Sequence, residues 1–278
     1  MILSIASGKG GTGKTTIAVN LALSIGDAQL IDCDVEEPNV NVFLNAEIED
    51  SEDVVVENPK ISERKCDYCG KCSDFCMYNA LAVVPSKVLV FPELCHSCGG
   101  CKLVCPRDAI DYQPRGIGSV EHGCVQGLDF YHGVLNVGEA LAIPVIKALK
   151  KKVDTSKDVI LDAPPGASCP VIETIGGSNY CILVAEPTPF GLHDLKLAVE
   201  VVRYLYVPFG VIINRDGVGD KKVEHYCKNE KIPVLMKIPH SDEIAQLYSK
   251  GVPFVKELPT WREEFVKLFK RIQEDIGK

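Results

Sequence analysis

The sequence contains no apolar run long enough to cross a membrane and nothing that resembles an export signal. A membrane-spanning helix needs roughly 18 consecutive apolar residues, and no stretch of this chain approaches that length. Residues 1–11 hold neither a basic leader nor a small-residue cleavage site. We therefore expect a cytoplasmic protein that makes no stable insertion into a membrane.

Positive charge is scarce as well. The chain carries 30 Lys and Arg against 38 Asp and Glu, which gives a formal net charge of −8 at pH 7. Nucleic-acid affinity comes mainly from Lys and Arg side chains that neutralise phosphates, so this balance argues against a DNA or RNA partner. Low-complexity segments are absent too, and a hydrophobic content of 46% is ordinary for a globular protein.

Cysteine, in contrast, is abundant, with 13 in 278 residues. Eight of them form one pattern, C-x2-C-x2-C-x3-C, written twice at an interval of 29 residues: Cys66, Cys69, Cys72 and Cys76, then Cys95, Cys98, Cys101 and Cys105. Disulfides are rare in the reducing compartment that we expect, so cysteines clustered in this way favour metal binding.

This spacing is typical of bacterial ferredoxins with two [4Fe–4S] clusters, in which the fourth cysteine of each run binds the other run's cluster. The predicted ligand sets are Cys66, Cys69, Cys72 and Cys105 for the first cluster, and Cys95, Cys98, Cys101 and Cys76 for the second. Zinc is the alternative metal, because C-x2-C pairs also bind zinc, but the doubled four-cysteine run fits cubane clusters better. Pro106 follows the second run as the pattern requires, whereas Met77 follows the first.

Apolar stretches of strand length alternate with helical stretches along most of the chain. The expected strands are residues 2–6, 29–34, 159–163, 180–185, 210–214 and 233–238, and the expected helices include 15–25, 139–152, 191–206, 220–228 and 261–276. Such alternation predicts an α/β fold with a mostly parallel sheet and helices on both faces. Residues 116–138 are rich in glycine and could not be assigned.

The cysteine block interrupts this α/β order. We therefore expect one discontinuous domain, made of residues 1–58 and 115–278, and a small inserted α+β domain of the bacterial ferredoxin kind at residues 59–114. Within the insert, residues 82–84 and 88–91 are the expected short strands. An insertion in the middle of a fold differs from a terminal fusion because both of its ends are anchored in the host domain.

The nucleotide-binding pattern G-x-x-x-x-G-K-[ST] occurs at Gly8–Thr15, between the first expected strand and the first expected helix. This context makes the motif specific and predicts a P-loop. Backbone N–H groups would surround the phosphates, Lys14 would reach the β and γ phosphates, and the Thr15 hydroxyl would bind Mg²⁺. The predicted nucleotide contacts in this segment are Gly8, Lys9, Gly10, Gly11, Thr12, Gly13, Lys14, Thr15 and Thr16.

The run KGGTGKT, which begins at Lys9, resembles the deviant P-loop of the MinD/ParA/Mrp superfamily. The resemblance continues at residues 32–34, which are similar to the switch I aspartates of that family. Residues 162–166 are similar to its Walker B and switch II motif. The resemblance spans nearly the whole chain outside the cysteine block, and it looks closest to the branch of the superfamily that carries an inserted ferredoxin domain. The fold implied is a P-loop NTPase.

Polar residues also stand where ligands of an open α/β sheet collect, at the carboxyl ends of strands. Asp162 at such an end is expected to hold Mg²⁺, and Asp34 to orient or activate the attacking water. A helix cap or a turn is the structural alternative for each aspartate.

The resemblance implies further roles. Lys9 would act as a catalytic lysine that reaches the phosphates bound by the partner subunit of an ATP-dependent homodimer. Asn214 would contact adenine, with Arg215 beside it. The switch II residues would be Pro164, Pro165 and Gly166.

Five cysteines lie outside the two runs: Cys33, Cys124, Cys169, Cys181 and Cys227. Free cysteine is commonly a core residue, and we expect this of Cys181. A redox or metal role is the alternative for Cys124 and Cys169. The C-terminal residues 261–276 have helical apolar spacing, and their acidic residues favour packing on the sheet over binding to a membrane surface.

Together these features predict a slow Mg²⁺-dependent ATPase whose nucleotide state is coupled to a two-cluster ferredoxin module. ATP-gated electron transfer to a partner protein is the leading hypothesis, because permanent ligation by eight cysteines suits an electron carrier better than a cluster donor. The alternatives are an ATPase that assembles or carries Fe–S or related metal clusters, with a cluster-acceptor protein as partner, and a ParA/MinD-like spatial organiser. Amide-forming cobyrinate synthesis ranks below these, because no glutaminase domain is present to supply ammonia.

Overall fold

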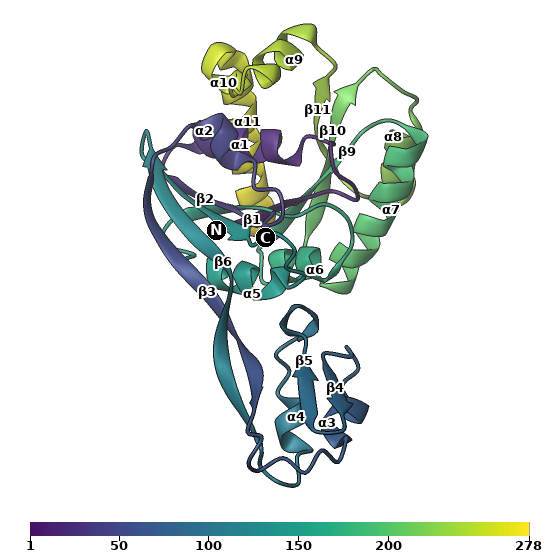
Figure 1. Cartoon of the computed structure of the whole chain (residues 1–278). Coiled ribbons are helices and arrows are strands. Elements are labelled where there is room, and N and C mark those ends of the chain that lie inside the picture. Colours follow the sequence, from purple (N-terminus) through teal and green to yellow (C-terminus); the bar gives the residue numbers. More distant parts are fainter. Residues whose placement is uncertain (278) are drawn as a thin grey trace.

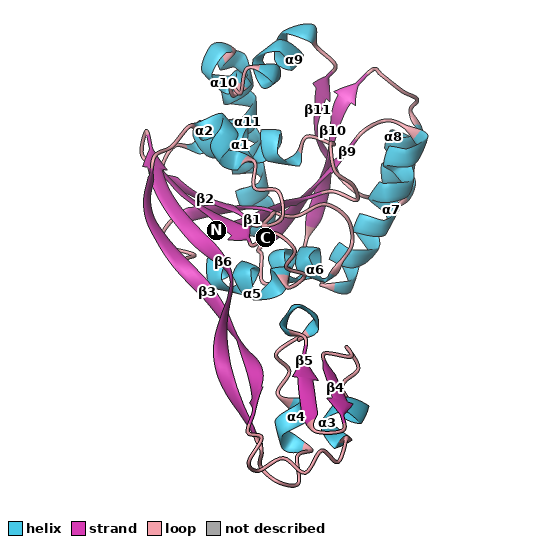
Figure 2. Cartoon of the chain, in the orientation of Figure 1, coloured by secondary structure: helices cyan, strands magenta, loops and turns pink. Residues whose placement is uncertain are grey.

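A nine-stranded sheet lies at the centre of the computed structural model, which describes residues 1–277 (Figure 1, Figure 2). Its strand order is β11-β10-β9-β1-β8-β2-β7-β6-β3. The strands from β11 to β7 are parallel: β1 (Ile2–Ala6), β2 (Ala28–Asp32), β7 (Leu128–Leu135), β8 (Asp158–Asp162), β9 (Tyr180–Ala185), β10 (Phe209–Asp216) and β11 (Val234–Pro239). The last two strands alternate in direction: β6 (Ile110–Val125) and β3 (Ile48–Ile61).

Helices cover both faces of this sheet, which confirms the α/β prediction. The helices on one face are α1 (Lys14–Ile25), α2 (Val40–Leu44), α10 (Phe254–Glu257) and α11 (Pro259–Ile276). Those on the other are α5 (Ala142–Lys150), α6 (Cys169–Ile175), α7 (Pro189–Tyr204) and α8 (Lys222–Asn229). A further helix, α9 (Asp242–Ser249), connects β11 with α10. Side chains alternate between the faces, so that Leu30 of β2 packs into one core and Ile31 into the other.

The helix expected at residues 139–152 is shorter than the sequence indicated. It begins at Ala142, so Pro144 falls in its first turn. Proline is tolerated there because the first N–H groups of a helix have no partner within the helix. Pro144 therefore gives no reason for a kink in α5.

The glycine-rich residues 116–138 form most of a hairpin made by β6 and β7. At Gly118 an added Cβ would lie 2.3 Å from the carbonyl oxygen of Val134, and at Gly133 it would lie 2.6 Å from a methyl of Val35. These glycines permit close packing of the backbone.

Strand β3 was not predicted either, because its first six residues are all exposed and show no alternation of apolar and polar side chains.

The C-terminal helix α11 packs its apolar face into the core. Phe265, Leu268, Phe269 and Ile272 are buried in the same cluster as residues of α1 and α10. This agrees with the expected packing on the body of the fold. No helix within residues 1–277 combines the length and the apolar character needed to cross a membrane.

Strands β3 and β6 continue past the rest of the sheet as a two-stranded antiparallel ribbon (Figure 1). Their pairing runs to Ile61 and Ile110, and residues 62–109, here called the cysteine module, lie at the far end. The module contains α3 (Lys71–Phe75), β4 (Leu81–Val84), β5 (Lys87–Val90), a short 3-10 helix η1 (Pro92–Leu94) and α4 (Gly100–Leu103). The connection to the host domain is thus a continuation of its sheet.

The backbone of the module repeats at the 29-residue interval of the cysteines. Residues with left-handed φ recur in pairs: Tyr68 and Ser97, Gly70 and Gly99, Asn79 and Asp108. Helices α3 and α4 start one interval apart, and the β4–β5 hairpin corresponds to residues 110–113 and 58–61 at the end of the ribbon. The tip of the ribbon therefore completes an internal twofold repeat.

Candidate functional site

The P-loop lies between β1 and α1, as the motif requires. Gly13 has φ of 93°, a conformation that side chains disfavour, and an added Cβ there would lie 2.4 Å from the Asn214 amide nitrogen. That amide donates a hydrogen bond of 2.8 Å to the carbonyl oxygen of Thr12. Asn214 therefore packs against the P-loop and stabilises its conformation. The adenine contact of Asn214 stays a prediction. Lys14 is buried within the loop.

A buried carboxylate lies beside the loop at the end of β8. Both oxygens of Asp162 are shielded from solvent and accept no hydrogen bond of normal geometry. Burial raises the pKa of Asp162, whereas the nearby Lys14 charge and Thr15 hydroxyl lower it. An orphaned carboxylate next to a threonine hydroxyl suits a hard divalent cation, which prefers oxygen ligands. The two residues predicted to hold Mg²⁺ are thus brought together.

Asp32 was identified from the sequence only as one of the switch I aspartates and was assigned no role of its own. It pairs in register with Asp162 across β2 and β8, and it is fully buried. Its carboxylate accepts backbone N–H groups of Asp34, Asn39 and Val40 at 2.9–3.0 Å. Asp32 therefore anchors the loop 33–39, here called switch I. Burial, followed by the charge of Asp162, raises the pKa of Asp32 well above its usual range.

Asp34 lies at the start of switch I and is partly exposed. Burial raises its pKa to about 6, while the Lys14 charge opposes the rise. A carboxylate with this pKa gains or loses its proton near physiological pH, as a group that positions or deprotonates water must. Its role in hydrolysis stays a prediction.

Lys9 contacts a buried acid of its own chain. Its ammonium lies 3.5 Å from the Glu186 carboxylate, which also receives a hydrogen bond of 2.6 Å from Arg215. Glu186 follows β9, and its side chain is only 10% exposed. The sequence alone gave no reason to assign Glu186 a role. The reach of Lys9 across a dimer stays a prediction.

Switch II follows Asp162 directly. Pro164 is buried and Pro165 is exposed, and the N–H of Gly166 donates to the Ser7 carbonyl at 3.0 Å. This bond ties switch II to the residue that precedes the P-loop.

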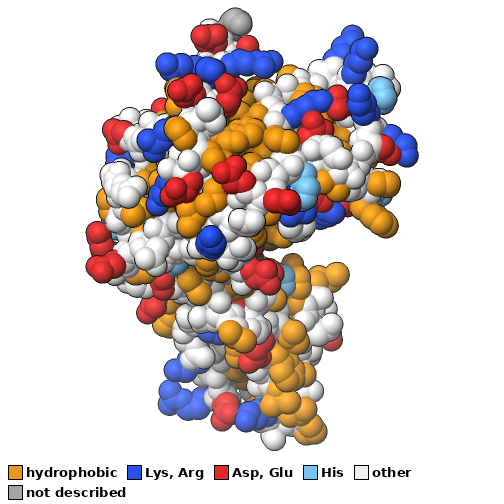
Figure 3. Space-filling view, turned by 90° about the horizontal axis from the view of Figure 1, so that it is seen from above, with side chains coloured by type: hydrophobic (Ala, Val, Ile, Leu, Met, Phe, Trp, Pro, Cys, Tyr) orange, Lys and Arg blue, Asp and Glu red, His pale blue; other side chains and the backbone are white. Residues whose placement is uncertain are grey.

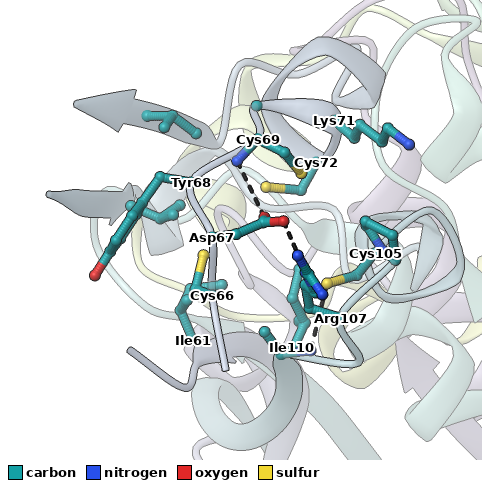
Figure 4. Close-up of a pocket in the computed structure, with 15 residues that line it drawn as sticks. Ile61, Cys66, Asp67, Tyr68, Cys69, Lys71, Cys72, Cys105, Arg107 and Ile110 are labelled. Carbon is teal, nitrogen blue, oxygen red and sulfur yellow. Dashed lines mark hydrogen bonds and ion pairs between the residues drawn. The ribbon is translucent and has the colours of Figure 1, made fainter. Parts of the chain in front are cut away.

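The eight repeated cysteines line two cavities of the module. Figure 4 shows the first, in which Cys66, Cys69, Cys72 and Cys105 surround one space. The Asp67 carboxylate beside it accepts the Arg107 guanidinium at 2.8 Å and the Cys69 N–H at 3.3 Å.

The second cavity repeats the first. It is lined by Cys76, Cys95, Cys98 and Cys101, with Tyr112, His96 and Tyr78 among its other neighbours. Each cavity therefore gathers three cysteines of one run and the fourth of the other, which is the crossed grouping that the ferredoxin spacing predicts.

The donor set of these cavities fits a metal–sulfur cluster better than a single ion. Backbone N–H groups of Ala80, Ser97 and Ala109 donate to cysteine sulfurs at 3.3–3.4 Å, the kind of bond that stabilises sulfur ligands of clusters. Burial raises the pKa of the Cys72 and Cys101 thiols, so metal binding would release protons. Within residues 1–277, no three His, Cys, Asp or Glu side chains are grouped to hold one metal ion. Cluster binding itself stays a prediction.

The other cysteines divide by burial. Cys33, Cys181 and Cys227 are buried, and Cys181 lies in the core as expected. Cys124 and Cys169 are exposed, and neither lies in a group suited to a metal among the described residues.

Comparison with known proteins agrees with the nucleotide site. The family model described as the CobQ/CobB/MinD/ParA nucleotide binding domain matches residues 3–254. The chain is 31% identical to the uncharacterized protein MJ0579 of Methanocaldococcus jannaschii, over 92% of each chain. It is 24% identical to the iron-sulfur cluster carrier protein of Pyrococcus horikoshii, over 99% of this chain and 89% of that protein.

The fold also matches a solved structure. The septum site-determining protein MinD of Pyrococcus horikoshii, solved with Mg-ADP, superposes with a TM-score of 0.59 at 21% identity, over 99% of this chain and 97% of that one. At this identity the likeness shows the fold alone. The family match extends over most of the chain and includes the P-loop, both switch segments and Asn214. The chain therefore belongs to the CobQ/CobB/MinD/ParA family of P-loop nucleotide-binding proteins.

Proposed function

We propose that this protein is a Mg²⁺-dependent ATPase whose nucleotide state controls electron transfer from a two-cluster ferredoxin-like module to a partner protein. The observation that carries the proposal is the pair of four-cysteine cavities at the end of a ribbon that continues the ATPase sheet. A redox module attached in this way moves with the sheet edge, whereas a module on a flexible tether would not.

The nucleotide half of the proposal rests on the buried acids and the P-loop. Backbone N–H groups of the loop and Lys14 would bind the phosphates, and Thr15 with Asp162 would hold Mg²⁺. Asp34 would orient the attacking water and accept its proton, consistent with the pKa of about 6. Water attacks the γ phosphorus, the bond from that phosphorus to the bridging oxygen breaks, and ADP leaves with phosphate.

The proposal includes an ATP-dependent homodimer. Lys9 lies against Glu186 in the isolated chain, and its side chain is 35% exposed. Release from Glu186 would free Lys9 to approach the phosphates held by a second copy, where a cation stabilises the charge that develops in phosphoryl transfer.

The module would hold two [4Fe–4S] clusters through eight thiolates, and such clusters supply one-electron transfer at potentials tuned by hydrogen bonds and solvent exposure. The N–H of Ala80 donates to Cys76 of the second cavity, and the N–H of Ala109 donates to Cys105 of the first. The two cavities therefore have one corresponding hydrogen bond each. The rims differ, because Phe75, Met77 and Tyr78 of the second cavity are exposed. Different rims favour different potentials, as a directional electron path requires.

Anaerobic purification with iron analysis tests this function. We expect about eight iron atoms per chain, in clusters that resist a chelator and cycle reversibly between two oxidation states. Mg·ATP should be hydrolysed slowly. Zinc in place of iron, or clusters that do not cycle, would contradict the proposal.

A cluster carrier is the second candidate. It is favoured by the similarity to the iron-sulfur cluster carrier protein of Pyrococcus horikoshii. ATP-stimulated loss of cluster from the module to an apo-acceptor protein, measured under the same anaerobic conditions, would support this candidate and contradict ATP-gated electron transfer.

A spatial organiser in the MinD/ParA manner is a candidate of another class, to which the family membership points. On the face shown in Figure 3, acidic and basic side chains are interspersed, and the net charge of −8 disfavours binding to phosphate backbones. Sedimentation with DNA or with liposomes in the presence of ATP separates this class, since salt-sensitive binding would support it.

A further inference from the structure

The ribbon leaves the sheet at a β-bulge. The register of β3 with β6 slips at this point, where Val54 pairs with Gly118 and Val55 with Gly116, so Ile117 is the extra residue. Ile117 is fully buried. A bulge bends its strand and increases the local twist, so it sets the direction in which the ribbon continues.

The last residue of β7 and the turn that follows it connect this bulge to switch I. The N–H of Leu135 donates to the Val35 carbonyl of switch I at 2.8 Å. The next residue, Asn136, donates its N–H to the Ile117 carbonyl at 2.9 Å and its side-chain amide to the Gly116 carbonyl at 3.3 Å. Two consecutive residues therefore contact the switch loop on one side and the bulge on the other.

The same turn holds the ribbon through a buried ion pair. The Arg115 guanidinium bonds to the Glu139 carboxylate, whose side chain is only 4% exposed. Glu139 also accepts the N–H groups of Ala140 and Leu141 at 3.1 and 3.2 Å, and Arg115 donates to the Asn58 side chain of β3 at 3.3 Å. One guanidinium thus ties both strands of the ribbon to the start of α5.

A row of polar side chains gives a second connection between the nucleotide site and the ribbon. The register aligns Asp162, Asp32, His132 and Glu121 on four neighbouring strands. His132 is buried, and its Nε2 lies 2.7 Å from the Glu121 carboxylate of β6. Side chains at one register position of adjacent strands lie side by side, so this row runs from the nucleotide site to β6, the strand that continues into the ribbon.

We propose that Arg115, Asn136 and Glu139 form an elbow that sets the angle of the ribbon according to the conformation of switch I. The inference rests on the proposed function in that it requires Mg·ATP to rearrange switch I, as phosphates do for switch loops in general. Because Val35 is bonded to Leu135, which directly precedes the turn that carries Asn136 and Glu139, a shift of the loop would displace both contacts to the ribbon. The ribbon acts as a lever, since residues 55–61 span roughly 20 Å at about 3.3 Å per residue.

Hydrogen exchange of the full-length, anaerobically prepared protein tests the elbow. A non-hydrolysable ATP analogue with Mg²⁺ is the probe, and exchange of the amides in residues 110–125 is the readout. In the natural protein we expect the analogue to change this exchange by about threefold or more. In Arg115→Gln and in Asn136→Ala, the change should fall below about half of that value while analogue affinity stays the same.

Lys152→Gln is the matched control, because it removes an exposed ion pair between Lys152, two residues after α5, and Glu52 of β3 without touching the elbow. It should respond to the analogue as the natural protein does. Asn136→Ala guards against misfolding of Arg115→Gln, since it deletes one hydrogen bond and leaves no buried charge unpaired.

Equal exchange with and without the analogue in the natural protein would overturn the inference, and so would a full response in both elbow variants. The proposed function is judged by a different signal, the potential of the clusters. A ribbon that responds to the analogue while the potentials do not would uphold the elbow and refute ATP-gated electron transfer.

Discussion

At the scale of single residues, the pairing of Asp162 with Asp32 governs the electrostatics of the nucleotide site. Two fully buried carboxylates in direct register repel each other when both are ionised, and burial raises the pKa of each. Lys14 offsets part of this cost at Asp162. A divalent cation between Thr15 and Asp162 would offset more, which supports the proposal that these residues hold Mg²⁺.

Substitution Asp162→Asn should separate metal binding from stability. We expect the Mg²⁺ concentration that gives half-maximal ATP hydrolysis to rise at least about tenfold, because one oxygen ligand loses its charge. The unfolding free energy should rise on the order of 1 kcal/mol at neutral pH, because the like-charge repulsion disappears. Urea unfolding and Mg²⁺ titration of the ATPase measure the two effects. Unchanged Mg²⁺ dependence would remove Asp162 from the metal site.

The pKa of about 6 at Asp34 predicts a pH dependence of hydrolysis. The raised pKa means that the carboxylate is protonated below pH 6, and a protonated group cannot accept the proton of water. We expect kcat/KM to fall about tenfold per pH unit below that point and to level off above it. A pH profile of Asp34→Asn should be lower throughout and lack this limb. If the variant keeps the limb, another group is the base.

Residue types and their spacing were enough to identify the P-loop residues, Asp162 and the eight repeated cysteines as candidates. The contacts of Glu186 with Lys9 and Arg215 could not be predicted, because the three residues come from separate parts of the chain. The role of Asp32 could not be predicted for a related reason. Both switch I aspartates follow the same strand, and only the structure shows that Asp32 is buried and holds the loop.

At the scale of elements, the P-loop depends on β10 through Asn214. The amide of Asn214 satisfies the Thr12 carbonyl, and its bulk occupies the space beside Gly13. A strand at one side of the sheet therefore holds the loop in the shape that binds phosphates.

Asn214→Ala should weaken nucleotide binding. The Thr12 carbonyl would lose its partner, a change that costs about 1–3 kcal/mol when the group stays buried, so we expect the ADP affinity to fall between about tenfold and a hundredfold. Calorimetric titration of ADP gives the measurement. Asn229→Ala, at the exposed end of α8, is the control and should bind as before.

The crossed grouping of the cysteines makes a second prediction about elements. Cys105 belongs to the second run by sequence but lines the cavity of Cys66. Cys105→Ser should therefore lose about half of the iron and the same EPR signal that Cys66→Ser loses, whereas Cys95→Ser should lose the other signal. The exposed Cys124→Ser should keep all of the iron. Loss of the same signal in Cys105→Ser and Cys95→Ser would mean that each run binds its own cluster.

Six of the seven parallel strands followed from apolar runs in the sequence, because buried parallel strands are continuously apolar. The same logic failed for β3, β6 and β7. Glycines such as Gly118 and Gly133 allow close packing in these strands, but a glycine-rich sequence has the composition expected of a loop. Residues 48–53 of β3 are all exposed, so they lack the alternation of apolar and polar residues that would predict a strand.

At the scale of the whole molecule, the sheet is the part common to both functions. Its middle strands carry the nucleotide site at their carboxyl ends, and its edge strands extend into the ribbon that carries the two cysteine cavities (Figure 1). Insertion at the end of the sheet beside switch I gives the module two covalent connections to the region that we expect to contact the γ phosphate. This placement is the reason for our proposal that the module is an output of the nucleotide switch.

Anaerobic redox titration of the clusters with Mg·ADP and with a Mg·ATP analogue, followed by EPR, tests this account most directly. The account predicts that the midpoint potential of at least one cluster shifts between the two nucleotide states, and that Asp162→Asn loses the shift together with Mg²⁺ dependence. Identical potentials and identical EPR signals in both states would contradict it, and would leave an ATPase and a cluster module that share a chain without coupling.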